Sequence, residues 1–158
     1  MARTSATGTE RRAAGFSLVE LLVVLVVLGL LGAAVLLTVP GEGRRLDDQA
    51  GRLAAHLQRA REHAVLSNRA VALRVDAEGY RFYERRLEGW REIGVQPFQA
   101  RSFPPGISAR TEGREPVVRF EFDALGSAQP AAVQLRSDAG GRRISLDARG
   151  EVALHATH

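Results

Sequence analysis

An apolar run near the N-terminus constrains this chain more than any other feature. It reads GFSLVELLVVLVVLGLLGAAVLLTVP over residues 15–40, and from Leu21 to Val39 it has 19 residues without a charge. A helix rises about 1.5 Å per residue, so this length spans roughly the 30 Å hydrocarbon core of a bilayer. A secretory signal has a shorter apolar region followed by a small-residue cleavage site, which the letters LGAA match poorly. We therefore predict one membrane-spanning helix.

Arginines lie on both sides of the apolar run. Three precede it and three follow it: Arg3, Arg11, Arg12, and then Arg44, Arg45, Arg52. Cytoplasmic flanks of membrane helices carry an excess of basic residues. The compact basic leader favours an N-terminus inside the cell and the bulk of the chain outside.

One carboxylate, Glu20, interrupts the front of the run. A charged side chain inside a bilayer costs on the order of 2.5–3.5 kcal/mol, so it is expected to be paired or functional. Phe16 lies four residues, one helical turn, before Glu20 and directly after Gly15. Cleavage between Gly15 and Phe16 would give Phe16 a cationic amino terminus, with which a carboxylate could pair. The spacing alone leaves a second interpretation open, in which Glu20 is a tolerated interfacial charge.

A second helix is expected after the apolar run. Pro40, Gly41 and Gly43 disfavour helix, so the chain should bend or unwind there. Apolar residues then repeat at alternating steps of four and three, which is typical of one helical face. They are Leu46, Ala50, Leu53, Leu57, Ala60 and Ala64. The pattern predicts an amphipathic helix over about residues 45–68 that needs another layer to pack against.

The region of about residues 70–156 is predicted to be β-sheet. The letters AVALRVD alternate, and the turn AEG leads into YRFYERR, so a first hairpin is expected. Turn signals bound further runs, namely WREI, QARSF, ISART, VVRFEF, AVQLRS, RRISLD and EVALH. Apolar residues share one side of these runs, as Val152 and Leu154 do, which predicts sheets wet on the other face. A helix on an antiparallel sheet defines the α+β fold class.

The residues give little support for catalysis or metal binding. The chain has no cysteine, which excludes disulfides and thiolate chemistry. His56 and His63 are seven residues apart and lack a third ligand. Asp138 and Asp147 are interpreted as turn residues rather than calcium ligands. We predict a protein that is not an enzyme and that has no metal and no cofactor.

The letters GFSLVELLVVLVVLGLLGAAV resemble the N-terminal motif of type IV pilins and type II secretion pseudopilins. In those families a prepilin peptidase cuts after the glycine and methylates the new amino terminus. The resemblance implies that Gly15 and Phe16 flank the cleaved bond and that Phe16 is N-methylated. It also implies that Glu20 forms an assembly salt bridge with that terminus. Ala14 and Glu10 depart from the usual motif without removing the scissile pair.

The soluble part resembles the H-type minor pseudopilins of type II secretion, the GspH/FimT family. The segments that carry this resemblance are AAHLQRAREHAVLSNRAVALRVDAEGYRFY, FDALGS and RRISLDARGEV. Gly126 and Ser127 fall in the second segment, a turn that requires tight backbone geometry. The resemblance implies a pilin-like fold with three parts: a leader at 1–15, a transmembrane and assembly helix at 16–39, and a periplasmic domain at 40–158.

The function that this resemblance implies is structural. The chain would be a subunit of the periplasmic pseudopilus, which drives export of folded proteins across the outer membrane. Implied partners are other major and minor pseudopilins, the prepilin peptidase, the inner-membrane assembly platform and secreted cargo. The protein would cross the bacterial inner membrane once, with its C-terminal domain in the periplasm.

Two alternatives stay open. A FimT-like minor type IV pilin would take part in pilus assembly and would use arginines to contact DNA phosphates. The candidates are Arg81, Arg85, Arg86, Arg91, Arg142, Arg143 and Arg149. Acidic residues such as Glu84 and Glu88 interleave with them and the net charge is only +4, so a solvated strand face is favoured over a nucleic-acid surface. An unrelated single-span membrane protein would have the Gly-Phe junction and Glu20 by coincidence.

Overall fold

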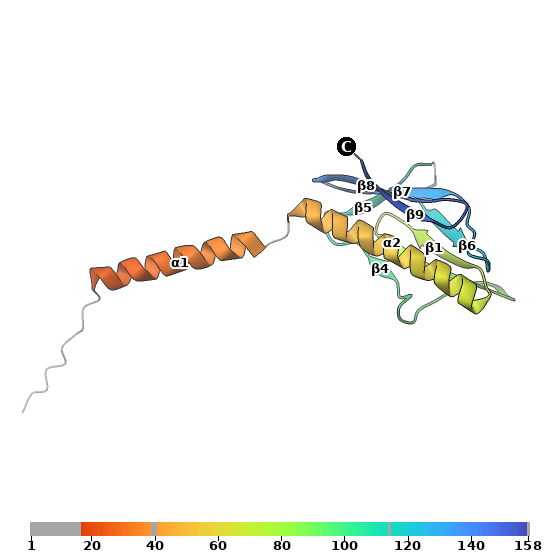
Figure 1. The fold of residues 1–158 in the computed structure, drawn as a ribbon, viewed down its shortest axis with the longest axis horizontal. Helices are drawn as coiled ribbons and strands as arrows, with labels where there is room; N and C mark the ends of the chain where they lie inside the picture. The colour runs from red at the N-terminus through yellow and green to blue at the C-terminus, as the bar shows by residue number, and fades with distance from the viewer. Residues whose placement is uncertain (1–16, 39–40, 114, 158) are drawn as a thin grey trace, which may run out of the picture. The chain divides into compact units, whose positions relative to one another are not determined.

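The computed structural model describes residues 17–38, 41–113 and 115–157. The described residues form two helices followed by nine strands (Figure 1). The helices are α1 (Leu18–Thr38) and α2 (Glu42–Ser67). The strands are β1 (Val71–Val75), β2 (Gly79–Arg86), β3 (Gly89–Glu92), β4 (Arg101–Ser102), β5 (Ser108–Thr111), β6 (Val118–Phe122), β7 (Ala131–Ser137), β8 (Gly140–Leu146) and β9 (Val152–Thr157). The chain divides into two units, one ending at Val39 and the other beginning at Pro40.

Helix α1 carries the apolar run. Its described side chains, from Leu18 to Gly32, are exposed. The Leu21 N–H donates to the Ser17 carbonyl (3.2 Å) and the Val19 N–H donates to the Ser17 hydroxyl (3.3 Å), which closes the first turn. In the part of the chain that the structure describes, no helix has both the length and the hydropathy that a membrane span requires. The membrane-spanning helix stays a prediction from the sequence.

Helix α2 confirms the predicted apolar stripe. Each of the six predicted positions is fully buried, and His56 joins them on the same face. The helix ends at Ser67, and Asn68 follows in a left-handed conformation (φ 53°, ψ 41°). The Arg69 N–H donates to the Ala64 carbonyl at 3.1 Å, which satisfies one of the free carbonyls at this end. The predicted end near Asn68 is therefore correct.

The first sheet is antiparallel and has the order β3-β2-β1-β6, with the short β4 paired to the other end of β2. The expected hairpin is β1–β2, with Val71 opposite Glu84 and Val75 opposite Tyr80. The outer face of this sheet is less exposed to solvent than predicted, because Ala72 is fully buried. Ala72 lies directly opposite Tyr83 and lines a small recess with that ring, so the ring covers it.

The second sheet is also antiparallel, in the order β5-β7-β8-β9. Val133, Leu135, Ile144 and Leu146 are buried on its inner face. The prediction that Leu154 is buried on an apolar face is wrong, since this side chain is 45% exposed. Leu154 pairs with Ile144 and so shares its face, but β9 is the edge strand and has a neighbour on one side only.

The core of the second unit lies between α2 and the two sheets. Figure 1 shows α2 lying along the strands, and it contacts β1 and β6 of the first sheet as well as β7, β8 and β9 of the second. The buried apolar cluster runs from Leu46 to Leu146, so this unit supplies its whole core by itself. The α+β prediction, with a helix packed on antiparallel sheets, is confirmed.

Candidate functional site

The predicted assembly site lies at the start of the first unit. Gly15 and Phe16 lie outside the described residues, whereas Glu20 lies in the first turn of α1 with an exposed side chain. The positive end of the helix dipole favours a carboxylate at this position. The pairing of Glu20 with the amine of Phe16 stays a prediction.

The two histidines of α2 take part in packing. His56 Nδ1 lies 2.8 Å from the Tyr80 hydroxyl, and the residue is 9% exposed. Burial lowers the pKa of His56, and the nearby guanidinium groups of Arg101, Arg59 and Arg52 lower it further. His63 packs on the Phe98 ring with a centroid distance of 4.8 Å. Across the described ranges, no three potential metal ligands come together.

Two turns of similar sequence, DALGS at 123–127 and DARGE at 147–151, fold alike. In each turn one aspartate oxygen accepts two backbone N–H groups. Asp123 Oδ1 accepts from Leu125 and Ser127, and Asp147 Oδ1 accepts from Arg149 and Glu151, at 2.8–2.9 Å. This role explains Asp147 without a metal. Asp138 is exposed in a different turn.

The two turns contact each other and α2. The Ala128 N–H donates to the Ala148 carbonyl (3.2 Å), and Arg61 Nε of α2 donates to the Gly126 carbonyl (3.0 Å). Gly126 and Gly150 have positive φ angles of 81° and 76°. A Cβ on Gly150 would lie 2.2 Å from the Gly126 oxygen. The tight geometry expected around Gly126 is therefore present, and it serves to fasten the end of β6 and the start of β9 to the helix.

The candidate DNA-contacting arginines do not gather on one surface. Arg142 forms an ion pair with Asp47, and Arg143 makes two bonds with Glu112 at 2.5 and 2.8 Å. The other five arginines lie in different places. Arg85 lies near the Trp90 ring, and Arg86 forms an ion pair with Glu84. Arg81 lies opposite Arg74, Arg91 is in β3, and Arg149 is in the second of the two turns. The fold therefore does not place all seven arginines on one phosphate-binding face.

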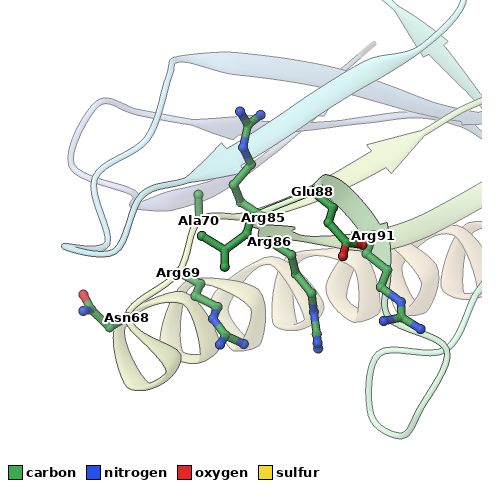
Figure 2. Close-up of a pocket in the computed structure, with 8 residues that line it drawn as sticks. Asn68, Arg69, Ala70, Arg85, Arg86, Glu88 and Arg91 are labelled. Atoms are coloured by element: carbon green, nitrogen blue, oxygen red, sulfur yellow. The ribbon is translucent and has the colours of Figure 1, made fainter.

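A pocket of about 690 Å³ lies where α2 ends beside the β2–β3 hairpin (Figure 2). Eight residues line it: Asn68, Arg69, Ala70, Arg85, Arg86, Leu87, Glu88 and Arg91. Figure 2 shows the side chains of Arg69, Arg86 and Arg91 extending to one side of the hairpin and that of Arg85 extending to the other. One side of the hairpin therefore carries three of the four guanidinium groups of the lining, and Glu88 adds one carboxylate to the lining.

Glu84 holds two of these arginines. Its carboxylate bonds Arg69 Nη1 at 3.1 Å and Arg86 Nη2 at 3.0 Å, and its side chain is only 7% exposed. Burial opposes ionisation of Glu84, but the hydrogen bonds and charges of Arg69 and Arg86 outweigh it and lower its pKa below the ordinary value. Glu84 is therefore buried, whereas its neighbours Arg85 and Arg86 are exposed, as the interpretation of these arginines as a solvated strand face expects.

The sequence does contain a signal for the burial of Glu84. Alternate residues of a strand share a face, so Glu84 shares one with Phe82 and Tyr80, both of which are buried. The pairing with Arg69 has no comparable signal, because Arg69 follows α2 and approaches only once the hairpin has folded.

The fold is similar to that of solved pilin-like proteins. The minor pseudopilin EpsH of the type 2 secretion system of Vibrio cholerae matches with a TM-score of 0.61 and 18% identity, covering 71% of this chain and 97% of that one. The type IV minor pilin FimU of Pseudomonas aeruginosa matches with a TM-score of 0.53 and 22% identity, covering 72% and 90%. The arrangement of α2 on its sheets is thus that of a pilin-like protein.

The family follows from sequence comparison. The family model described as "Type II transport protein GspH" matches residues 49–150, and that of the "Prokaryotic N-terminal methylation motif" matches residues 11–36. The chain belongs to the GspH family, which confirms the predicted resemblance.

Curated relatives include the type II secretion system proteins H of Aeromonas hydrophila and Pseudomonas aeruginosa. The first is 42% identical over 78 residues, covering 48% of this chain and 43% of the relative. The second is 41% identical over 87 residues, covering 52% and 51%. The chain spans about half the length of these relatives.

Proposed function

We propose that this protein is a minor pseudopilin of the type II protein secretion system, a structural subunit rather than an enzyme. The observation that carries the proposal is the presence in one chain of the methylation motif at 11–36 and the GspH family match at 49–150. The protein works as part of the periplasmic pseudopilus and helps to export folded proteins across the outer membrane. Its partners are other major and minor pseudopilins, the inner-membrane assembly platform and secreted cargo.

The N-terminal segment anchors the subunit and is processed before assembly. The prepilin peptidase removes residues 1–15 by cutting between Gly15 and Phe16, and Phe16 is then N-methylated. Residues 16–39 form the transmembrane and assembly helix, which holds the precursor in the bacterial inner membrane with the domain at 40–158 in the periplasm. The uncharged stretch from Leu21 to Val39 supports this anchor.

Glu20 fixes the register of the subunit in the filament. After cleavage the methylated amine of Phe16 is a cation at neutral pH, and in an apolar helix bundle an unpaired charge costs several kcal/mol. A pair between this amine and Glu20, in the same or a neighbouring subunit, recovers much of that cost. The exposed position of Glu20 in the first turn of α1 supports this role, because the carboxylate is available to a partner.

Processing is tested by the intact mass of protein extracted from membranes. We expect a chain that starts at methylated Phe16 in wild type and uncut precursor in Gly15→Leu, since a side chain there obstructs the peptidase. Gly29→Leu, a change elsewhere in the same apolar run, serves as the control and should be cut normally. A mature chain that starts near Ala33 would mean ordinary signal cleavage and would refute the proposal.

Assembly is tested with Glu20→Ala. This variant should insert and be cut normally, because the scissile bond is untouched, but its crosslinking to filament neighbours and the secretion of cargo should fall. Glu42→Ala, which removes an exposed carboxylate from the first turn of α2, should leave both unchanged. Wild-type secretion by Glu20→Ala would show that Glu20 is only a tolerated interfacial charge. Normal secretion with lost twitching or DNA uptake would favour the FimT-like minor pilin.

A further inference from the structure

The pocket beside the β2–β3 hairpin is arranged to receive carboxylates. We propose that it binds an acidic segment of a partner protein, one that also carries apolar side chains. The inference does not rest on the proposed secretion function, because the residues of the pocket carry it alone. Its partner is defined by chemistry: a run of aspartate or glutamate interleaved with leucine-like residues.

Glu84 preorganises the pocket. Arg69 and Arg86 each use part of their guanidinium group on the two oxygens of this buried carboxylate. Their side chains are still 51% and 49% exposed, so further N–H groups stay available to solvent or a ligand. A guanidinium group has five N–H donors in a fixed fork that matches a carboxylate. Because Glu84 already orders both arginines, a ligand loses less side-chain entropy when it binds them.

The charge of the pocket favours one or two carboxylates over a polyanion. Arg91 is exposed, and no described residue forms an ion pair with it. Glu88 lines the same pocket and places a negative charge at the rim. Glu84 and Glu88 offset two of the three arginines on this side, so a nucleic-acid backbone, with a charge on every nucleotide, gains little there, whereas a peptide can place its acidic residues away from Glu88.

The rim adds an apolar contact. Leu87, at the tip of the hairpin and in the lining of the pocket, is fully exposed. A partner segment that covers the pocket would bury this side chain, and the burial of apolar area stabilises association. This combination of ordered guanidinium groups and exposed leucine selects an acidic and partly apolar protein segment.

Binding is measured with the fragment that begins at Pro40, which has its own core, and a short synthetic peptide of alternating glutamate and leucine. The comparison peptide has glutamine in place of glutamate. We expect the acidic peptide to shift the NMR signals of residues 68–70 and 85–91, and the glutamine peptide to leave them unchanged. Arg91→Gln should weaken binding about fivefold and Glu88→Gln should strengthen it by a similar factor.

Matched variants separate the pocket from the general charge of the surface. Arg136→Gln removes an exposed arginine from β7 and should change the affinity less than twofold. Leu87→Ser should weaken binding of the peptide without unfolding the fragment, because the side chain is exposed. Peptide shifts elsewhere on the fragment, equal effects of Arg91→Gln and Arg136→Gln, or a single-stranded oligonucleotide that occupies the pocket more tightly than the acidic peptide would each overturn the proposal.

Discussion

Gly150 is the position at which one added methyl group should be most informative. It lies in the second of the two similar turns with φ +76°, a region that L side chains occupy at a cost of about 1–2 kcal/mol. A Cβ there would lie 2.2 Å from the Gly126 oxygen and 2.9 Å from Arg61 Nε. The first of these atoms is backbone, so Gly150→Ala requires the two turns to move apart.

The expected cost has two parts. The positive φ contributes about 1–2 kcal/mol. Separation of the turns also breaks the bond from Arg61 Nε to the Gly126 oxygen, which is 3.0 Å long and partly buried. A hydrogen bond from a charged group contributes about 1.5–3 kcal/mol, and we take the lower end because Arg61 is only half-buried. Gly150→Ala should therefore destabilise the second unit by about 2.5–3.5 kcal/mol, out of a total of roughly 5–15 kcal/mol.

Gly106→Ala is the matched control. Gly106 has a similar φ of +84°, but a Cβ there would meet nothing within 4 Å. It should lose only the first part, about 1–2 kcal/mol. Both variants are compared by urea denaturation of the fragment that begins at Pro40, followed by the fluorescence of Trp90, which is the one tryptophan of the chain. Equal losses for Gly150→Ala and Gly106→Ala would refute the reasoning, because they would show that the turns separate freely.

Three further predictions concern the same unit. Phe120→Asp should abolish the folded circular dichroism spectrum, because Phe120 is fully buried and an unpaired charge in the core costs several kcal/mol. Leu66→Asp should fold, since Leu66 is 85% exposed, and a folded Phe120→Asp would contradict the core assignment. Asp147→Ala should lose about 1–2 kcal/mol in urea denaturation, because Oδ1 accepts two N–H groups, and Asp138→Ala less than about 0.5 kcal/mol; similar losses would count against the turn. The pKa of His56 in the folded chain is lowered from 6.5, so the unfolded chain binds a proton more readily and the unfolding free energy should fall as the pH drops below about 6.5 towards the folded-state pKa. His56→Leu should flatten this part of the pH profile of the unfolding free energy, and an unchanged slope would show that other groups cause it.

Local patterns predicted the elements of the fold but not their neighbours. The six apolar positions of α2 repeat with the helical period, and that period alone was enough to predict that these residues are buried. The strand from Val118 to Phe122 was equally readable from its alternating letters. Nothing in those letters indicates that β6 pairs with β1, more than 40 residues earlier, because alternation defines a face of a strand and not its partner.

The errors have the same origin. Leu154 has the right alternation for a core residue, but its exposure depends on β9 being the last strand of its sheet. Glu84 has the alternation of a buried residue, but its charge suggested the surface, since a buried carboxylate needs partners. The partners are Arg69 and Arg86, and only the folded hairpin brings Arg69 within 3.1 Å of it. In both cases the burial of the side chain depends on its neighbours in the fold, and the local sequence pattern does not specify those neighbours.

The same distinction separates the two proposed surfaces of the protein. The proposed processing motif around Gly15 is a linear signal, so a peptidase that cuts there would recognise it without the second unit. The pocket at Arg91 is assembled from the end of α2 and a hairpin, and it exists only when that unit is folded. The two proposals are therefore separable by mutation. Arg91→Gln should leave cleavage at Gly15 intact, and Glu20→Ala, made in the full chain, should leave the affinity for the acidic peptide unchanged. If Arg91→Gln blocked cleavage, the peptidase would have to recognise the folded unit as well as the motif, and the two surfaces would not be independent.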